Sequence, residues 1–564
     1  MLPELHLRPA GASRGAVEEA IRRSVRFLDA HRKPEGSWVG ELSSSALATS
    51  MSWVALKQHA GHRLEGRLLQ ATEWLADTQH GDGGWGDGIT DASTINSTAL
   101  ATAVLHMADA RRFRDRLARA MHCLDSMGGV AAINDPARAT LSGPCRTVWA
   151  IAGLVPWPEI RSLPVEISLL PKPVRRTVST TFPAFLSLAM LHDRFRPVSP
   201  IRRPLRRLCA QRGCAWLRRA QCSNGGFEES AFLTSIVALC LQATAADDVA
   251  SRAAAYVEQQ QRADGSWPID RDLETFDSAL SVMALSGLGR RFDEPSDRAL
   301  RDWFLAAQFR EVCFPTGAPP GGWAWAQPGG WPDLDDTPAA IRALLRLGIP
   351  ATDRRILDGI GFLREMQNRD GSWSTFVKNS PMPFDRSCPY ITGHVLSAFA
   401  EIGGTVGDRT VGRALRFLQR VQRGDGSYEA IWFRNSVAGT ASVLEALVAL
   451  RLGDAPMAHG AASWLCRAQR SDGSWGGDAG QTSTVEETAW ACHALTLWQP
   501  QSPALSVEHG IDWLIRHQRA DGTWPQAVIG LYFSTLWYSD SMYAVALPLR
   551  ALATYRRLRQ GPPE

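Results

Sequence analysis

The sequence predicts an all-α fold made of repeated helical hairpins, and two observations lead to this prediction. A short motif recurs along most of the chain, and the segments between its copies carry apolar residues at helical spacing. In "AIRALLRL", for example, Ile341, Leu344 and Leu345 stand at positions i, i+3 and i+4 of one helix face. Segments with the alternating pattern of a strand are sparse. We therefore expect stacked helices.

The repeated motif is a glutamine followed six residues later by an aromatic residue, with a glycine two positions before the aromatic. Neighbouring copies are mostly about 40–56 residues apart, a spacing typical of repeat architectures. We expect the glutamine to close a helix and the glycine to make the turn, and we interpret the motif as a lock between helices. Weaker copies precede Trp38 and Trp323. The clear copies are "QHGDGGW" from Gln79, "QCSNGGF" from Gln221, "QRADGSW" from Gln261, "QNRDGSW" from Gln367, "QRGDGSY" from Gln422, "QRSDGSW" from Gln469 and "QRADGTW" from Gln518.

The composition describes a globular chain of 564 residues, 45% hydrophobic and 21% charged. A net charge of +4 gives no indication of nucleic-acid binding. The ten cysteines include no CxxC pair, which indicates reduced cytoplasmic thiols rather than disulfides or a zinc site. No apolar run approaches the roughly 18–20 residues needed to span a bilayer, and the first residues lack the apolar core of a secretory signal.

The segment "WPDLDDT" crowds Asp333, Asp335 and Asp336 into four residues, and three interpretations are open. The cluster can start a helix, with Asp336 or Thr337 as the cap and Pro338 in the first helical position. It can bind Mg²⁺, although the chain has neither a DDxxD motif nor a second Asn/Ser/Glu metal motif. Alternatively, carboxylates crowded in a poorly solvated site cannot all ionise, so one keeps its proton and serves as an acid.

The segment "DLDDT" within an array of Gln-to-aromatic repeats, preceded by "GGWAW" (Gly321–Trp325), resembles the squalene-hopene cyclase and oxidosqualene cyclase family, the class II terpene cyclases. The resemblance extends over nearly the whole chain. It implies two α/α barrels, one inserted into the other, with a large apolar cavity between them. We expect an N-terminal segment at 1–39 that packs with the catalytic barrel, the inserted barrel at 40–271, and the catalytic barrel at 272–564.

The resemblance also favours the acid among the three interpretations of the cluster. By position, Asp335 would protonate a terminal alkene, flanked by Asp333 and Asp336, and His394 in "CPYITGHVL" would hydrogen-bond to this acid. The family has an acidic residue four positions before this histidine, where this chain has Tyr390. Whether the nearby Asp385 replaces that acid is left open.

Aromatic side chains would line the cavity, stabilise cations and exclude water. Two further family positions are not aromatic here, Ala438 and Asp540, so we expect an altered cavity that stops the cyclisation differently or takes another substrate. By resemblance, the expected lining residues are Trp157, Phe276, Trp325, Phe376, Trp432, Tyr532 and Tyr543.

The function implied by the resemblance is a protonation-initiated cyclisation of a linear polyprene, with squalene to a hopene-like triterpene as the leading reaction. This intramolecular isomerase would need no cofactor and no metal. One alternative is a class II cyclase of a C15–C20 prenyl diphosphate, which would need a basic pocket and Mg²⁺. Others are a catalytically silent polyprene-binding scaffold and a prenyltransferase-like barrel, for which the chain has no Asp/Cys/His zinc set.

The segment Leu163–Leu191 joins a basic stretch to a ten-residue apolar run. Lys172, Arg175 and Arg176 lie in it, and no acid occurs between Glu166 and Asp193. These features are typical of a segment lying at an anionic membrane surface, while the alternative is a buried helix with an exposed loop. We expect a cytoplasmic protein, peripheral or monotopic at the membrane, and leave a homodimer open.

Overall fold

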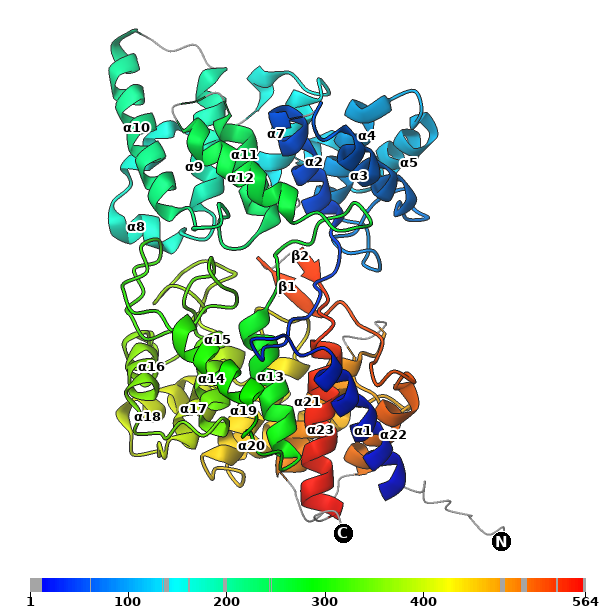
Figure 1. The fold of residues 1–564 in the computed structure, drawn as a ribbon, viewed down its shortest axis with the longest axis vertical. Helices are drawn as coiled ribbons and strands as arrows, with labels where there is room; N and C mark the ends of the chain where they lie inside the picture. The colour runs from blue at the N-terminus through cyan, green and yellow to red at the C-terminus, as the bar shows by residue number, and fades with distance from the viewer. Residues whose placement is uncertain are drawn as a thin grey trace.

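A computed structural model describes residues 13–560 except 61, 134, 136–140, 161–162, 196–199, 243, 245, 477–481, 499–504 and 534–535. The described chain is mostly helical, which confirms the predicted all-α class. Its helices form two bodies stacked along the long axis (Figure 1), with the first helix, α1, and the last, α23, in the same body. We call the body with α1 and α13 to α23 the terminal barrel, and the body with α2 to α12 the inserted barrel.

The terminal barrel is a closed ring of inner helices surrounded by outer ones. Each inner helix packs on the next inner helix, and α23 returns to α13 to close the ring. The inner helices are α13 (Glu274–Gly287), α15 (Asp336–Arg346), α17 (Pro389–Glu401), α19 (Val437–Ala449), α21 (Val485–Trp498) and α23 (Tyr543–Tyr555). The outer helices are α14 (Pro295–Ala307), α16 (Arg354–Glu365), α18 (Arg409–Val421), α20 (Pro456–Ala468) and α22 (Leu505–His517). Helix α1 (Arg14–Ala30) packs against α22 and α23, and a π-helical turn (Arg556–Gln560) follows α23.

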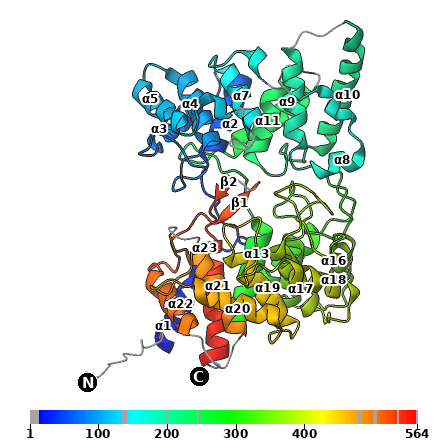
Figure 2. The same ribbon diagram turned by 180° about the vertical axis from the view of Figure 1, so that it is seen from behind.

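The inserted barrel repeats this plan with a smaller ring, seen from behind in Figure 2. Its inner helices contact one another in order, and α11 closes onto α2. They are α2 (Ala46–Ala60), α4 (Ile95–Asp109), α7 (Ser142–Ile151), α9 (Phe182–Arg194) and α11 (Ala231–Leu241). The other elements are α3 (Glu65–Asp77), α5 (Arg114–Ser126), α6 (Gly129–Ile133), α8 (Lys172–Thr177), α10 (Arg203–Ala220), α12 (Asp247–Gln259) and three short 3-10 helices, η1 (Trp157–Glu159), η2 (Val165–Leu169) and η3 (Pro200–Arg202).

The apolar pattern of each helix explains whether it lies in the inner or the outer ring. In α18 the buried residues Val411, Ala414, Phe417 and Leu418 form one stripe, so this helix covers the core with one face. In α19 every residue from 437 to 447 is buried, as required of a helix surrounded by protein. The alternation of these two helix types along the chain produces the double-walled ring.

The Gln-to-aromatic repeats connect neighbouring outer helices. The amide of Gln367 donates to the Gly371 carbonyl in its own turn and to the Thr410 carbonyl in the first turn of α18, both at 2.9 Å. The indole of Trp373 donates to the Leu363 carbonyl at 2.7 Å. Gly371 has φ +99°, and an added Cβ would lie 2.4 Å from the Arg413 carbonyl oxygen, so glycine is needed there. The repeat thus ends one helix, begins the next segment and ties both to the following outer helix.

Hydrogen bonds from a repeat glutamine also close the outer ring of each barrel. Gln261, after α12, donates to the Arg67 carbonyl of α3 at 2.9 Å. Gln518, after α22, donates to the Ala20 carbonyl of α1 at 2.9 Å. Helix α1 therefore completes the outer ring of the terminal barrel from the opposite end of the chain.

A short antiparallel hairpin lies between the two barrels (Figure 1). Strand β1 (Gly530–Tyr532) pairs with β2 (Leu536–Tyr538), with Leu531 opposite Trp537. Isolated bridges join Leu42 to Asp540 and Ser230 to Asp270. The hairpin and the two chain segments that cross between the barrels therefore meet in one layer, where the cavity described below is found.

Replacement of Gln367 by alanine tests whether the two hydrogen bonds of a repeat glutamine stabilise the fold. The change leaves two carbonyls without their donor, and we expect it to lower the free energy of unfolding by about 1–3 kcal/mol. Thermal or urea unfolding measures this difference. The matched control is Gln259→Ala on the exposed surface of α12, which should stay within about 0.5 kcal/mol of wild type. Equal effects of the two changes would refute a stabilising role of the Gln367 hydrogen bonds.

Candidate active site

A cavity lies between the barrels. Its walls come from the crossing segments, the first turns of inner helices, the loops after three of the aromatic repeats, and the hairpin. The lining residues are Leu42, Ile269, Asp270, Leu273, Phe276, Trp325, Asp333, Asp335, Asp336, Thr375, Phe376, Trp432, Phe433, Tyr532, Tyr538 and Tyr543. The three clustered aspartates therefore share one aromatic cavity.

Asp333 holds the acidic loop in place. Its backbone N–H donates to the Trp323 carbonyl, and its Oδ1 accepts the N–H groups of Asp335 and Asp336 at 2.8 and 2.7 Å. The carboxyl is buried, and burial raises its pKa to about 8, with Asp335 as a further cause. Asp333 therefore orders the turn and holds a proton near neutral pH.

Asp336 opens helix α15 and contacts the carboxyl of Asp333. Burial, followed by the charges of Asp333 and Asp335, holds its pKa well above the usual range. Two carboxyls in contact away from water cannot both be ionised without a large repulsion. This pair therefore stays largely protonated and adds little negative charge to the cavity.

The helix-cap interpretation of the cluster is partly correct, with a different residue in the role. Helix α15 begins at Asp336, so Pro338 occupies the third helical position and not the first. The cap acceptor is Asp333, whereas the Thr337 hydroxyl accepts the Trp323 N–H at 2.9 Å. Asp333 thus accepts the backbone N–H groups at the start of the helix, and the Asp335 side chain makes no cap hydrogen bond.

Asp335 is the most accessible of the three, with 16% of its side chain exposed. Its Oδ1 lies 2.7 Å from Nδ1 of His394, which projects from α17. Among the described residues, no hydrogen-bond donor contacts its second carboxyl oxygen. The structure therefore brings together Asp335, its two neighbours and His394 as the sequence predicts, with one oxygen of Asp335 available to a molecule in the cavity.

His394 lies against aromatic rings. The Tyr390 ring centroid is 5.3 Å from that of His394, and the Phe276 centroid is 5.7 Å away. Asp385 does not replace the missing acid. Its two oxygens accept the N–H groups of Thr375, Phe376 and Val377, so it shapes the loop that presents Phe376 to the cavity.

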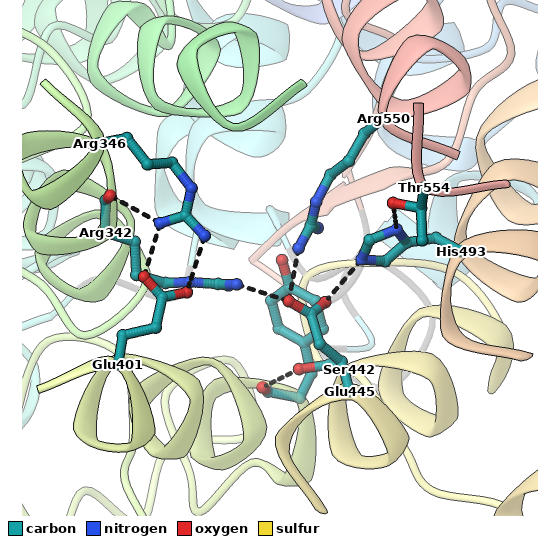
Figure 3. A network of polar contacts seen from close by, with 9 residues as sticks. Arg342, Arg346, Glu401, Ser442, Glu445, His493, Arg550 and Thr554 are labelled. Carbon is teal, nitrogen blue, oxygen red and sulfur yellow. Dashed lines mark hydrogen bonds and ion pairs between the residues drawn. The ribbon is translucent and has the colours of Figure 1, made fainter. Parts of the chain in front are cut away.

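Figure 3 shows a buried charged network inside the terminal barrel. Glu445 of α19 accepts a hydrogen bond from Arg342 of α15 at 2.6 Å and another from Arg550 of α23. Arg342 also donates to Glu401 of α17 at 2.7 Å. Glu445 and Arg550 line a second, smaller cavity together with His394. The network thus links four inner helices, and two of its residues share a small cavity with His394.

The predicted aromatic lining is found in the cavity with one exception. Phe276, Trp325, Phe376, Trp432, Tyr532 and Tyr543 all line it. Trp157 does not, because it belongs to η1 of the inserted barrel, where its ring stacks on Phe195 at 3.9 Å. That expectation is therefore corrected: the Trp157 ring packs on Phe195 within the inserted barrel.

The two positions expected to alter the lining lie behind it. Ala438 is fully buried in α19, and Asp540 is fully buried before α23. The Asp540 Oδ1 accepts the N–H groups of Met542 and Tyr543 at 2.7 and 3.0 Å, so it fixes the start of the helix that carries Tyr543. Its carboxyl also contacts that of Asp277, and burial raises the pKa of Asp540 to about 6.

Several lining residues were missed by sequence reasoning. Phe433 follows Trp432 directly, and Tyr538 lies in the hairpin, where alternate residues share a face. Asp270 was not singled out because a single acid in a crossing segment has no motif around it. Its place in the cavity depends on the pairing of distant segments.

The fold and the site together define a class: two α/α barrels with a hydrogen-bonded aspartic acid in an aromatic cavity between them, as in class II terpene cyclases. The profile of the squalene-hopene cyclase C-terminal domain matches residues 274–557, and that of the N-terminal domain matches 21–182. A prenyltransferase α-α toroid profile matches 171–275. The chain belongs to the squalene-hopene cyclase family.

Individual relatives are distant. The chain is 25% identical to a probable squalene-hopene cyclase of Sinorhizobium fredii, covering 96% of this chain and 97% of that protein. It is 26% identical, over 87% of its length, to a terpene cyclase-glycosyl transferase fusion protein of Humicola fuscoatra, and spans about half of that longer protein (46%). The structure of ent-copalyl diphosphate synthase from Streptomyces platensis superimposes with a TM-score of 0.63 at 21% identity, over 96% of this chain and 99% of that one, a likeness of fold alone.

The raised pKa of Asp333 predicts a pH dependence of stability. The folded protein holds this proton up to about pH 8, whereas an unfolded aspartate releases it near 3.8. Native protein therefore binds more protons in this window, and the contribution is lost as pH rises through it. Asp333→Asn keeps the acceptor oxygen and cannot ionise. We expect the fall in Tm between pH 5 and pH 8 to be smaller in this variant by a few degrees.

Scanning calorimetry or circular dichroism measures this slope. Asp302→Asn is the control, because that carboxylate is 75% exposed and should leave the slope unchanged. Parallel pH profiles for wild type and Asp333→Asn would contradict the assignment of the proton to Asp333.

Proposed function

We propose that the protein protonates the terminal alkene of a linear polyprene through Asp335 and folds the chain into rings. The observation that carries this proposal is the free oxygen of Asp335 in the aromatic cavity, while its other oxygen contacts His394 at 2.7 Å. Squalene is the proposed substrate and a hopene-like polycyclic triterpene the proposed product. The reaction is an isomerisation and uses no cofactor.

The geometry supports the protonation step. When Asp335 gives up its proton, negative charge develops on the carboxyl, and a hydrogen bond from Nδ1–H of His394 to Oδ1 stabilises it. Asp333 and Asp336 are largely protonated, so they do not oppose this charge with full negative charges of their own. A carboxylic acid that shares a buried site with neutral neighbours can thus deliver a proton to an alkene.

The walls then support the cation that moves along the substrate. The rings of Trp325, Phe376 and Trp432 meet edge to face, with successive centroids 5.5 and 5.7 Å apart. The Trp432 indole donates to the Thr375 hydroxyl, which fixes its ring. Each aromatic face offers a cation on the order of 0.5–2 kcal/mol, and the rings exclude water that would quench it early.

The charge of the lining favours a hydrocarbon over a prenyl diphosphate. Among the described residues that line the cavity, four are aspartates and none is a lysine, arginine or histidine. A diphosphate placed among these acids would meet no counter-charge in the wall. An apolar polyprene needs none, and its burial is favourable by roughly 25 cal/mol per Å².

We also propose contact with a membrane surface, from which an apolar substrate can be taken. Within the described residues, no helix has both the length and the apolar character required to cross a bilayer. The predicted apolar run forms α9, which is mostly buried, so that run itself is a core helix. However, η2, α9, α10 and η3 pack together. These elements, α8 and the residues next to them expose apolar side chains, and Lys172 and Arg176 of α8 are exposed as well. We call these side chains the apolar patch: Leu163, Leu169, Val174, Phe185, Phe195, Ile201, Leu205 and Leu208.

Incubation with candidate substrates tests the cyclisation. Detergent-solubilised protein is mixed with squalene or geranylgeranyl diphosphate, with and without EDTA, and products are analysed by mass spectrometry. We expect cyclised hydrocarbon from squalene, unaffected by EDTA. Asp335→Asn should lower its formation by roughly 10²–10⁴-fold, because the acid is lost. Asp302→Asn is the control and should retain full turnover.

The other outcomes discriminate between alternatives. Cyclised diphosphate products in place of hydrocarbon would overturn the proposed substrate. Tight squalene binding without any product would identify a silent scaffold. Undiminished turnover by Asp335→Asn would show that another group supplies the proton.

Vesicle sedimentation tests the membrane contact. We expect wild-type protein to bind vesicles of mixed phosphatidylcholine and phosphatidylglycerol, and the combined variant Val174→Ser, Phe185→Ser, Ile201→Ser to bind at least about tenfold more weakly, since each change removes exposed apolar surface. The matched control replaces three similarly exposed residues elsewhere: Leu69→Ser, Leu357→Ser and Val406→Ser. An equal loss in both combined variants would argue against a specific patch.

A further inference from the structure

Asp270 is an acidic residue of the cavity wall that takes no part in the proposed protonation step. It lies in the segment that crosses from α12 to α13, and it lines the same cavity as Asp335. The residue is only 3% exposed, and its Oδ1 has no hydrogen-bond partner among the described residues. A buried carboxyl oxygen without a partner costs free energy, so its presence in an otherwise aromatic wall requires an explanation.

The backbone beside Asp270 is held in a costly conformation. Ser230 pairs with Asp270 in an antiparallel bridge, and the Arg271 N–H donates to the Glu229 carbonyl at 2.9 Å. The two residues before Ser230, Glu228 and Glu229, have φ of 56° and 55°. Such left-handed conformations cost about 1–3 kcal/mol each for residues other than glycine and tend to occur at functional sites. This strained turn places Glu228, also buried with an unpartnered Oε1, next to Asp270.

A line of rings leads from the acidic loop to Asp270. The loop is joined to Thr375, whose carbonyl accepts the Leu334 N–H, and Phe376 follows it in the cavity wall. The Phe376 and Trp432 centroids are 5.7 Å apart, and those of Trp432 and Tyr532 are 5.9 Å apart. The hydroxyl of Tyr532 lies near the Asp270 carboxyl and lowers its pKa. Asp270 therefore lies at the end of this line of rings.

We propose that Asp270 is the base that ends the cyclisation, an inference that rests on the proposed function. Its carboxylate removes a proton from the carbon next to the last cationic centre. The C–H bond breaks, its electron pair forms the product C=C bond, and Asp270 becomes a carboxylic acid. Asp335 has meanwhile become a carboxylate. Water takes the proton from Asp270 and returns one to Asp335, so the overall reaction is an isomerisation.

The surroundings keep Asp270 able to ionise. Burial raises its pKa to about 7, against the lowering effect of Ser230 and Tyr532. Burial and the charge of Asp270 hold the pKa of Glu228 well above its usual range, so Glu228 keeps its proton when Asp270 is ionised. The titratable and charged groups that act on Asp270 or adjoin it are Glu228, Glu229, Tyr256, Arg271, Asp272, Tyr532 and Tyr538.

The ratio of products tests this role independently of the rate. Wild type and Asp270→Asn are incubated with squalene at pH 8, and cyclic alkenes and cyclic alcohols are separated by gas chromatography with mass spectrometry. The ratio is taken among the cyclised products that form, so it does not depend on how fast the variant consumes squalene. The alkene-to-alcohol ratio should fall at least about tenfold, because water then quenches the last cation. An unchanged ratio would overturn the proposal.

A control and a second measurement keep the test independent of variant folding. Asp272→Asn removes a neighbouring acid that pairs with Arg271 at 2.7 Å and does not line the cavity, and it should leave the ratio unchanged. In wild type, the ratio should fall between pH 8 and pH 6 as Asp270 becomes protonated. A ratio independent of pH, or a wild-type product that is entirely alcohol, would refute the role of Asp270 as the base.

Failure of the proposed function gives a different pattern. Conversion of geranylgeranyl diphosphate but not squalene would overturn the substrate, and the same ratio measured on those products would still decide the role of Asp270. Absence of any cyclised product from wild type would overturn both proposals.

Discussion

The structure depends on the double hydrogen bond made by each repeat glutamine. One amide, such as that of Gln367, binds a carbonyl of its own turn and a carbonyl of the next outer helix. Because the turn glycine lies against that same helix, the distance between neighbouring outer helices is fixed at every repeat. Repetition of this spacing closes both barrels, and the loops that leave the repeats are carried to the layer between them.

The chemistry follows from the placement of polar groups in that layer. Trp323 belongs to a repeat with an insertion, and its carbonyl holds the acidic loop through Asp333. Asp385 shapes the loop after another repeat and so presents Phe376. Acids in structural roles thus position the residues that face the cavity, while Asp335 keeps a free oxygen. The buried Arg342–Glu445–Arg550 network joins three inner helices of the terminal barrel, where each charged group finds an opposite charge (Figure 3).

Much of the fold and the central part of the site could be predicted from sequence, because both depend on local patterns. The repeat and the helical spacing indicate an all-α chain. The resemblance carried by "DLDDT" and "CPYITGHVL" points to Asp335 and His394, which the structure places in contact. Trp157 was misplaced because an aromatic residue in a short turn has no periodicity to indicate which way it faces. Asp540 was taken for a lining position, although its carboxyl caps a helix and lies behind Tyr543.

The sequence by itself determined the helical class, the repeated lock and the crowding of three carboxyls, since each is expressed within a few consecutive residues. Only the tertiary structure decided which carboxyl is free: Asp333 accepts two backbone N–H groups, Asp336 contacts Asp333, and Asp335 alone contacts His394. It also decided that Asp270 faces the same cavity, through a bridge to Ser230 forty residues earlier. These outcomes depend on contacts between distant segments, and no local pattern of residues encodes them.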